Sequence, residues 1–272
     1  MAPVVRVGAV NYLNTKPLIH DLGALAPDAE LLLDVPSRLA DLLAAGRLEV
    51  ALIPVIEYFR AGTYSIVPDI AIASRGPVLS VTLFSRVPWA GIRRVALDEG
   101  SRTSAALAQI LLRQRHGVCP EVVPLPLDRG AEDVDADAVL LIGDRAMRAC
   151  LPGFAYAFDL GQEWHDWTGL PFVYAVWAVR PGADLGGVAA ALAEAKRRGL
   201  ARAGLIAHRE APGLGLDAGF CRRYLGNIIH FDLGPREQAG LHHYYMLACE
   251  LGLARRGMNL DFYRPTNLVE SR

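Results

Sequence analysis

The chain has 272 residues, of which 52% are hydrophobic and 21% charged, and its formal net charge is -1. This length allows one large domain or two small ones with a substantial buried core. The balanced charge, without long runs of one sign, argues against a protein that binds nucleic acid or a membrane surface. No window reaches the roughly 18 uninterrupted apolar residues that a membrane-spanning helix needs.

Four cysteines, Cys119, Cys150, Cys221 and Cys249, lie far apart and form neither a CxxC nor a Cys/His metal-binding spacing. Scattered thiols of this kind fit a reducing compartment. The N-terminus enters a strand-like run directly, without the apolar stretch and cleavage site of a signal peptide. No metal or cofactor motif is present. We therefore expect a cytoplasmic protein that uses neither a metal nor a cofactor.

The first predicted unit is a strand, a polar turn and a helix. Residues 7–10 form an apolar run typical of a buried strand, an amide-rich turn extends to Thr15, and Pro17 suits the first turn of a helix. Ligands of α/β proteins bind at the carboxyl ends of strands, often against helix N-termini. Asn11 and Asn14 are the side chains that this turn can offer a ligand. The alternative is that both only cap the helix.

The following segments predict a parallel β-α-β-α-β arrangement. Its further elements are strands over residues 31–35, 49–55 and 65–73 and a helix over 38–45. A longer strand is predicted over 76–85, with Ser80 inside an otherwise apolar stretch.

A second block of the same kind runs from about residue 88 to 172. It contains predicted strands over 95–97, 121–125 and 138–142 and a helix over 105–116, and Asp144 is placed to cap another helix. An apolar strand over 172–179 follows, and the remainder is predicted to be mostly helical over 185–202, 217–225 and 235–256.

Two long strands, 78–85 and 172–179, thus bracket the second block. A chain that leaves one α/β lobe by one strand and returns by another makes a two-lobed protein with a ligand cleft between the lobes. We expect an α/β fold in which each lobe is a mostly parallel sheet flanked by helices. The predicted lobes are residues 1–86 with 178–272, and residues 87–177.

The chain resembles the chorismate dehydratase family of the futalosine route to menaquinone. The resemblance is carried, in order, by VNYLNTKPL, DVPSRLADLLAAGRLEVALIPVIEY, SRGPVLSVTLFS, LDEGSRTSAALAQILL, AVLLIGDRAM and WHDWTGLPFVYAVWA. It implies the fold of type 2 periplasmic binding proteins. The tail after residue 182 has no diagnostic motif. The sister enzyme of the pathway, which forms a dihydroxynaphthoate, is expected to carry a serine–proline–cysteine turn where this chain has NYLN.

The resemblance also implies the reaction and its principal residues. Chorismate, a dianion, would lose water to give 3-[(1-carboxyvinyl)oxy]benzoate, and Asn14 and Ser80 would be the catalytic residues. An amide is not basic at neutral pH, and Ser80 has no histidine companion in the sequence. We therefore hypothesise that these two residues orient the substrate and that one of its own carboxylates takes the proton. Glu57, the nearest acidic candidate, is expected to be structural.

A dianion needs hydrogen-bond donors, and a helix head can supply them. Ser101, Arg102, Thr103 and Ser104 offer hydroxyls, a guanidinium and free backbone N–H groups at the positive end of a helix. We expect ligand contact through Thr103 or Ser104. Ser101 could instead be a plain cap, and Arg102 could bind a substrate carboxylate or form a salt bridge between the lobes.

Two further turns are candidates for lining the cleft. Gly143 and Asp144 follow a predicted strand, and Thr168 and Gly169 precede the returning strand. Backbone donors at these turns could reach the substrate, although Asp144 is also a candidate helix cap.

Two binding functions compete with the enzyme. A solute-binding protein of a transporter would share the fold and the cleft, but the sequence shows no secretion signal or lipobox cysteine. The effector domain of a transcription regulator would normally follow a helix-turn-helix segment, and none precedes residue 5.

Overall fold

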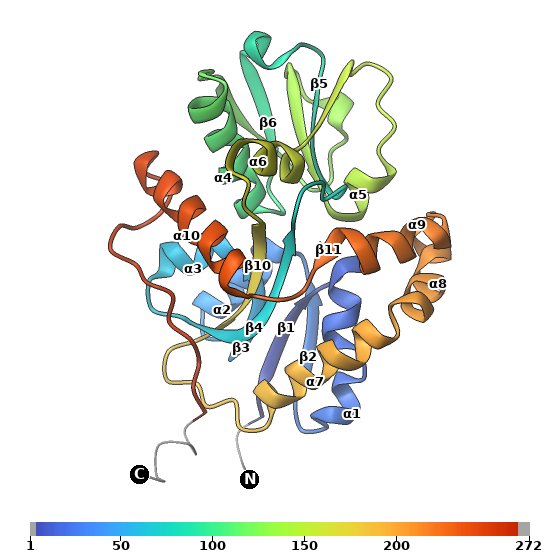
Figure 1. The fold of residues 1–272 in the computed structure, drawn as a ribbon, viewed down its shortest axis with the longest axis vertical. Helices are drawn as coiled ribbons and strands as arrows, with labels where there is room; N and C mark the ends of the chain where they lie inside the picture. Colours follow the sequence, from blue (N-terminus) through green and yellow to red (C-terminus); the bar gives the residue numbers. More distant parts are fainter. Residues whose placement is uncertain (1–3, 266–272) are drawn as a thin grey trace.

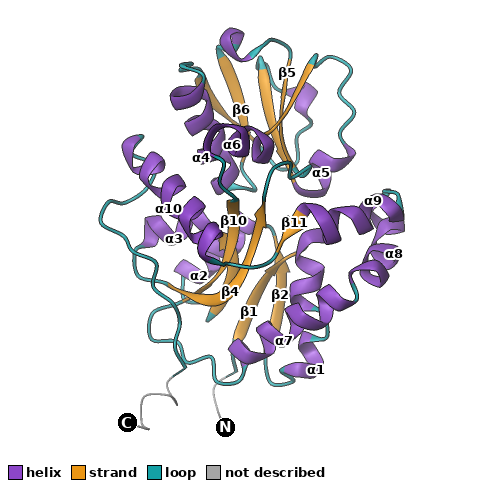
Figure 2. Cartoon of the chain, in the orientation of Figure 1, coloured by secondary structure: helices purple, strands orange, loops and turns teal. Residues whose placement is uncertain are grey.

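The computed structural model describes residues 4–265 and consists of two β-sheets, each covered by helices (Figure 1, Figure 2). The larger sheet occupies the lower half of Figure 1 and the smaller sheet the upper half. Within the described residues, no helix combines the length and the apolar character needed to cross a membrane.

The first sheet has six strands in the order β11-β4-β10-β3-β1-β2. β1 pairs in parallel with β2 and β3, whereas β10 is antiparallel to β3 and β4, and β11 is antiparallel to β4. Its strands are β1 (Arg6–Val10), β2 (Glu30–Asp34), β3 (Val50–Pro54), β4 (Ser65–Ser74), β10 (Phe172–Val179) and β11 (Ile229–His230).

The second sheet has five strands in the order β7-β6-β8-β5-β9. β6 is parallel to β7 and β8, whereas β5 is antiparallel to β8 and β9. Its strands are β5 (Val81–Ser85), β6 (Arg94–Asp98), β7 (Glu121–Leu125), β8 (Ala138–Ile142) and β9 (Tyr156–Asp159).

Helices follow most strands and cover both sheets (Figure 2). Those of the first half are η1 (Leu13–Ile19), α1 (Leu22–Leu25), α2 (Pro36–Ala44), α3 (Val55–Ala61), α7 (Val188–Ala201), α8 (Ala203–Leu214), α9 (Ala218–Arg223), η5 (Tyr224–Ile228) and α10 (Pro235–Glu250). Those of the second half are η2 (Trp89–Gly91), α4 (Arg102–Ile110), η3 (Leu111–Arg115), η4 (Ala131–Asp133), α5 (Gly143–Arg148) and α6 (Leu160–Thr168).

The two-lobed α/β fold is confirmed, but both sheets are mixed, so the prediction of mostly parallel sheets was wrong in this respect. The reason lies in the strands that enter each sheet from the other half. β10 inserts between β3 and β4, and β5 inserts between β8 and β9. Each runs away from the opposite half of the molecule, and therefore antiparallel to neighbours that point toward that half.

The chain crosses between the sheets at residues 75–80 and again at 169–171. The lobe boundaries taken from the sequence lie several residues later, and would leave β5 with the first sheet and most of β10 with the second. The predicted strand over 76–85 is also shorter, because Leu79 has a positive φ of 62° that interrupts the extended backbone. Ser80 therefore lies in a bend directly before β5.

The first crossing is fixed by the carboxylate of Asp159 at the end of β9. It accepts hydrogen bonds from the backbone N–H groups of Val78 and Leu79 in the crossing, at 2.7–3.0 Å, and from Gly161 and Gln162 at the start of α6, at 2.9–3.0 Å. Burial raises the pKa of the Asp159 carboxyl, and these N–H groups oppose that shift. One side chain thus ties the strained bend before Ser80 to a helix N-terminus.

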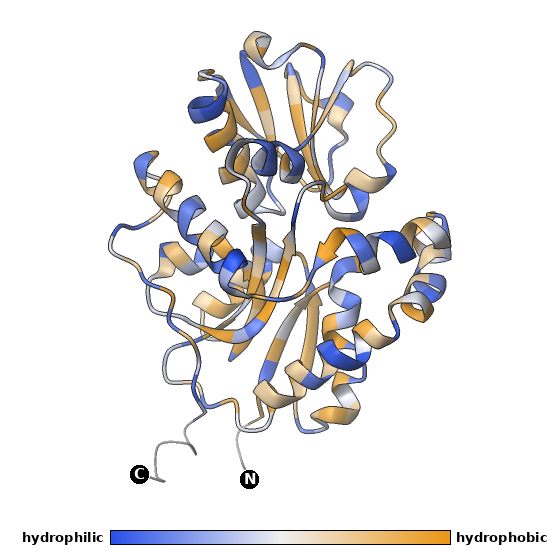
Figure 3. Ribbon diagram, viewed as in Figure 1, coloured by the Kyte–Doolittle hydropathy of each residue, from blue (hydrophilic) through white to orange (hydrophobic). Residues whose placement is uncertain are grey.

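The C-terminal helices pack closely on η1 and on the second crossing. A Cβ at Gly199 of α7 would overlap the Pro17 carbonyl of η1, and one at Gly240 of α10 would overlap the Pro171 carbonyl of the second crossing. Only glycine permits such close approach of two backbones. Figure 3 shows hydrophobic residues along the strands of both sheets, where the core lies, whereas much of α6 is hydrophilic.

A charged cluster connects the ends of β1, β3 and β10 that face away from the second sheet. The Glu49 carboxylate accepts from the backbone N–H of Arg6 at 2.8 Å and from its guanidinium at 2.7 and 3.0 Å. It also accepts from Arg180 at 3.3 Å. These donors lower the pKa of Glu49 to about 2, against an unperturbed value of 4.5, and Arg6 makes the largest contribution.

We predict that Glu49→Gln lowers the free energy of unfolding at pH 7 by about 1 kcal/mol, a modest value because solvent screens the partly exposed arginines. Since the folded-state pKa is depressed, ionised Glu49 stabilises the fold fully above about pH 4.5, and this contribution is lost as the pH falls toward 2. Urea unfolding measured between pH 7 and pH 3 should therefore show that the free energy of unfolding falls less steeply with decreasing pH for the variant than for the wild type. Parallel curves would contradict this role.

Glu194→Gln provides a comparison, because Arg197 and Arg198 also lower the pKa of Glu194 to about 2, but this ion pair lies within one helix and is more open to solvent screening than that of Glu49. Its effect should be smaller than that of Glu49→Gln.

Candidate functional site

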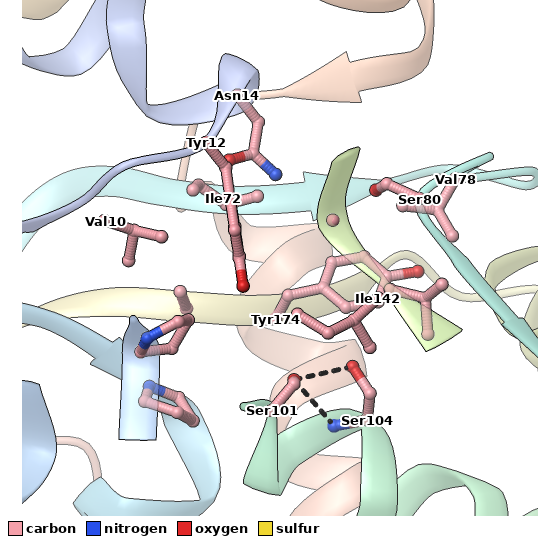
Figure 4. A pocket seen from close by; sticks show the side chains of 15 residues that line it. Val10, Tyr12, Asn14, Ile72, Val78, Ser80, Ser101, Ser104, Ile142 and Tyr174 are labelled. Atoms are coloured by element: carbon pink, nitrogen blue, oxygen red, sulfur yellow. Dashed lines mark hydrogen bonds between the residues drawn. The ribbon is translucent and has the colours of Figure 1, made fainter. Parts of the chain in front are cut away.

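A cavity lies between the two sheets, where strands of both halves end and helices begin (Figure 4). Its lining residues come from both halves and from the first crossing. They are Val10, Tyr12, Asn14, Pro36, Pro54, Ile72, Val78, Ser80, Val81, Ser101, Ser104, Ile142, Gly143, Tyr174 and Ala175. The N-termini of α2 and α4 both open onto this cavity, which is the edge of the sheets where α/β proteins bind ligands.

Asn14 and Ser80, the two predicted catalytic residues, lie on the same cavity and are joined through a third side chain. The hydroxyl of Tyr224 donates to Ser80 Oγ at 2.8 Å and accepts from Asn14 Nδ2 at 3.2 Å. Ser80 is 2% exposed and Tyr224 1%. The backbone carbonyl of Ser80 also accepts from Gly143 N at 2.7 Å. The site is therefore assembled from η1, the first crossing, α5 and the C-terminal segment.

The start of α4 contributes two hydroxyls to the cavity. Ser101 caps the helix by accepting from the backbone N–H of Ser104 at 3.4 Å, which the sequence analysis gave as the alternative to ligand contact. Its hydroxyl donates to Ser104 Oγ at 2.8 Å, and both bonds are drawn in Figure 4. Gly143 also lines the cavity, with a positive φ of 62° at the start of α5. A Cβ at Gly143 would press on the Tyr12 ring at 3.0 Å, so glycine makes room for this tyrosine.

Three predicted binding residues have other partners and do not line this cavity. Asn11 is exposed and accepts from Lys16 Nζ at 2.9 Å. The Arg102 guanidinium lies 2.9 Å from Asp41 and 3.4 Å from Glu57, so it forms the salt bridge between the halves that was the alternative. Thr103 is fully buried, and its hydroxyl accepts from Ile56 N at 3.2 Å.

The other two turns also make internal contacts. Asp144 does not cap α5, because that helix begins at Gly143; its carboxylate instead accepts from Leu13 N at 3.3 Å and joins the two halves. Burial raises the pKa of Asp144. The Thr168 hydroxyl donates to the Trp164 carbonyl at 2.8 Å, and Gly169 ends α6. Neither Thr168 nor Gly169 lines the cavity.

Three tyrosine hydroxyls at the site were missed by the sequence reasoning. Tyr12 lies between the two asparagines in the recognised turn and extends across the cavity (Figure 4). Tyr174 lies in β10, which the sequence suggested to be wholly apolar, and its hydroxyl is 3.1 Å from Ser74 Oγ. Tyr224 belongs to the tail, where no local motif could have indicated it. A search for tyrosines within the resembling segments would have found the first two.

The cavity is mostly apolar and presents a few neutral polar groups, without a charged side chain in its lining. None of the 15 lining residues within the described part of the chain is Asp, Glu, His, Lys or Arg. Burial raises the pKa of Tyr12, Tyr174 and Tyr224, so their hydroxyls are neutral donors at physiological pH. The arrangement offers neutral hydroxyls, an amide and helix N-termini to a ligand, which suits the orientation of an anion without a salt bridge.

Two further ionisable side chains, Glu57 and His165, do not line the cavity. Glu57 is engaged by Arg60 at 2.6 Å and by Arg102. His165 is half-buried on α6, where Nδ1 is 3.4 Å from the Leu170 carbonyl oxygen.

Comparisons with known proteins agree on the family. Residues 5–250 match the model of a family described as menaquinone biosynthesis. The chain is 34% identical over 260 residues to a chorismate dehydratase of Thermus thermophilus, covering 89% of this chain and 93% of that protein. It is 26% identical over 253 residues to a chorismate dehydratase of Campylobacter jejuni, covering 91% and 99%.

Solved structures support the fold. Protein AF1704 from Archaeoglobus fulgidus superposes with a TM-score of 0.72 at 19% identity, covering 92% of this chain and 98% of that one. The periplasmic aliphatic sulphonate-binding protein SsuA of Escherichia coli gives 0.61 at 17% identity, covering 94% and 96%. These likenesses establish a periplasmic-binding-protein-like fold, and the family match extends through most of the helical tail. The chain therefore belongs to the menaquinone biosynthesis family.

Proposed function

We propose that this protein is a chorismate dehydratase, a hydro-lyase that converts chorismate to 3-[(1-carboxyvinyl)oxy]benzoate and water, and that it works in the cytoplasm. The relatives named for this activity support the reaction. The single structural observation that supports it best is that Asn14 and Ser80 line one uncharged cavity and are connected by hydrogen bonds through Tyr224.

The reaction breaks two bonds of the substrate ring. The C–H bond next to the enolpyruvyl ether gives up its proton, and its electron pair becomes a ring double bond. The C–O bond to the hydroxyl group on the adjacent ring carbon breaks, and the departing hydroxide takes up a proton to leave as water. The ring becomes aromatic, so the protein has to hold one orientation and assist one proton transfer.

An uncharged cavity favours a substrate carboxylate as the proton acceptor. A carboxylate that is removed from water and faces no cation has a raised pKa, because desolvation disfavours its charged form. It is then a stronger base than in solution, and it lies within the same molecule as the proton it takes. Asn14, Ser80, Ser101 and Ser104 would hold the ring and the second carboxylate by neutral hydrogen bonds, with the start of α4 behind the serines.

The activity is tested by incubating the purified protein with chorismate and separating the products by chromatography. We expect one equivalent of an aromatic enol ether for each chorismate consumed. Chorismate that binds and is recovered unchanged would instead indicate a solute-binding protein.

Ser80→Ala should lower kcat while leaving the fold intact. Loss of one hydrogen bond to an oxygen that is charged, or that becomes charged in the transition state, corresponds to about 1–3 kcal/mol of transition-state stabilisation. Ser85→Ala is the matched control, because Ser85 is a buried serine of β5 whose hydroxyl donates to the Val87 carbonyl at 2.6 Å, away from the cavity. Turnover and melting temperature are measured on the same preparations. Equal turnover of the two variants would exclude Ser80 from the reaction.

Asn14→Asp should weaken chorismate binding and slow turnover by about tenfold or more, because a negative charge would face a dianion where solvent screens poorly. Asn11→Asp makes the same charge change on the exposed side of the same turn and should leave both parameters near the wild-type values. Titration with chorismate and steady-state kinetics compare the two. Similar behaviour of both variants would remove Asn14 from the site.

A further inference from the structure

Tyr224 occupies a specific place in the hydrogen-bond network of the site. It is the first residue of η5, in the tail that carries no recognisable motif, and its side chain is fully enclosed by protein. Its hydroxyl lies 2.8 Å from Ser80 Oγ and 3.2 Å from Asn14 Nδ2. Tyr224 itself is not among the residues that line the cavity. Any effect it has on a ligand therefore passes through its two neighbours.

The directions of these hydrogen bonds follow from the donors available. The Thr15 hydroxyl lies 3.4 Å from Asn14 Oδ1 and donates to it, which orients the amide so that its NH₂ group faces Tyr224. An amide NH₂ group can only donate, so the phenol oxygen accepts there. The phenol has one proton, and the remaining neighbour, Ser80 Oγ, receives it.

The consequence falls on the proton of Ser80. Because Ser80 Oγ already accepts from Tyr224, its own O–H points elsewhere, and the cavity that Ser80 lines is the open direction. Hydrogen bonds in such a chain polarise one another, so the terminal hydroxyl becomes a stronger donor. Without the phenol proton, the Ser80 hydroxyl would be free to rotate toward other acceptors.

We infer that Tyr224 is a positioning residue that acts through Ser80: it directs the Ser80 hydroxyl proton into the cavity, toward an oxygen of the bound substrate. This role rests on the proposed function, because the oxygen it serves belongs to chorismate. Through Tyr224, the C-terminal segment thereby influences the reaction without touching the reacting atoms.

Tyr224→Phe tests the role, because it removes one hydroxyl and keeps the ring. We expect kcat for chorismate to fall about tenfold while KM stays within about twofold. Tyr58→Phe is the control: Tyr58 is equally buried, and its hydroxyl makes two 2.8 Å hydrogen bonds, both to the backbone of residues Asn259 and Asp261. Tyr58→Phe should lower the melting temperature while kcat stays near the wild-type value.

A double variant separates action through Ser80 from a general effect on packing. In the Ser80→Ala background, Tyr224→Phe should change kcat by less than about twofold, because the hydroxyl that it orients is already absent. Independent, multiplying losses would overturn the inference, as would a wild-type kcat for Tyr224→Phe. A rise in KM at unchanged kcat would also overturn it.

Folding is followed by circular dichroism and by melting temperature in all variants. If Tyr224→Phe unfolds more readily than Tyr58→Phe but its folded fraction turns over chorismate at the wild-type rate, the hydroxyl is structural and the inference fails. A wild-type protein that makes no product overturns the proposed function, and the role of Tyr224 with it. An active wild type with an unaffected Tyr224→Phe overturns the role of Tyr224 alone.

Discussion

The Asp159 carboxylate is the contact on which the geometry of the site depends. It gathers backbone N–H groups from the first crossing and from the start of α6, and so holds Leu79 in a left-handed conformation that an unsupported leucine disfavours. That conformation ends the extended backbone and presents Ser80 to the cavity. The same contact fixes where the chain passes from one sheet to the other.

The antiparallel insertion of β5 and β10 follows from this passage. Each strand starts at the interface between the halves, whereas the neighbouring β-α units end there. As a result, the carboxyl ends of strands from both sheets and the N-termini of α2 and α4 face one cavity. A fold shared with solute-binding proteins thereby provides donors for an anion without a charged side chain in the lining.

The absence of charge in the described lining has a chemical meaning for the proposed reaction. A cation in contact with a substrate carboxylate would lower its basicity, whereas neutral hydroxyls and an amide can orient it and leave it able to accept a proton. The charged residues near the cavity serve instead to join the halves, as Arg102 does with Asp41 and Glu57, and as Asp144 does with Leu13 N. Charged groups thus stabilise the contact between the two halves, while neutral groups line the cavity.

The helical tail completes the site although its sequence has no diagnostic motif. The contact of Gly199 with Pro17 holds η1, which carries Asn14, and Tyr224 connects Asn14 with Ser80. The family match, which reaches residue 250, includes these elements.

Local sequence patterns indicated most of the individual elements and the two-lobed α/β class, because apolar periodicity and helix caps act over a few residues. They also indicated Asn14, Ser101, Ser104 and Gly143 as candidates, whereas Ser80 was implied by the family resemblance; all five line the cavity. Only the tertiary structure decided strand direction within the sheets, since pairing depends on where the chain crosses. It also decided that Arg102, Thr103 and Asp144 bind other groups of the same chain, and that the Tyr224 hydroxyl reaches Ser80, 144 residues away in sequence. Such contacts bring together segments that have no common local pattern, so the folded chain alone specifies them.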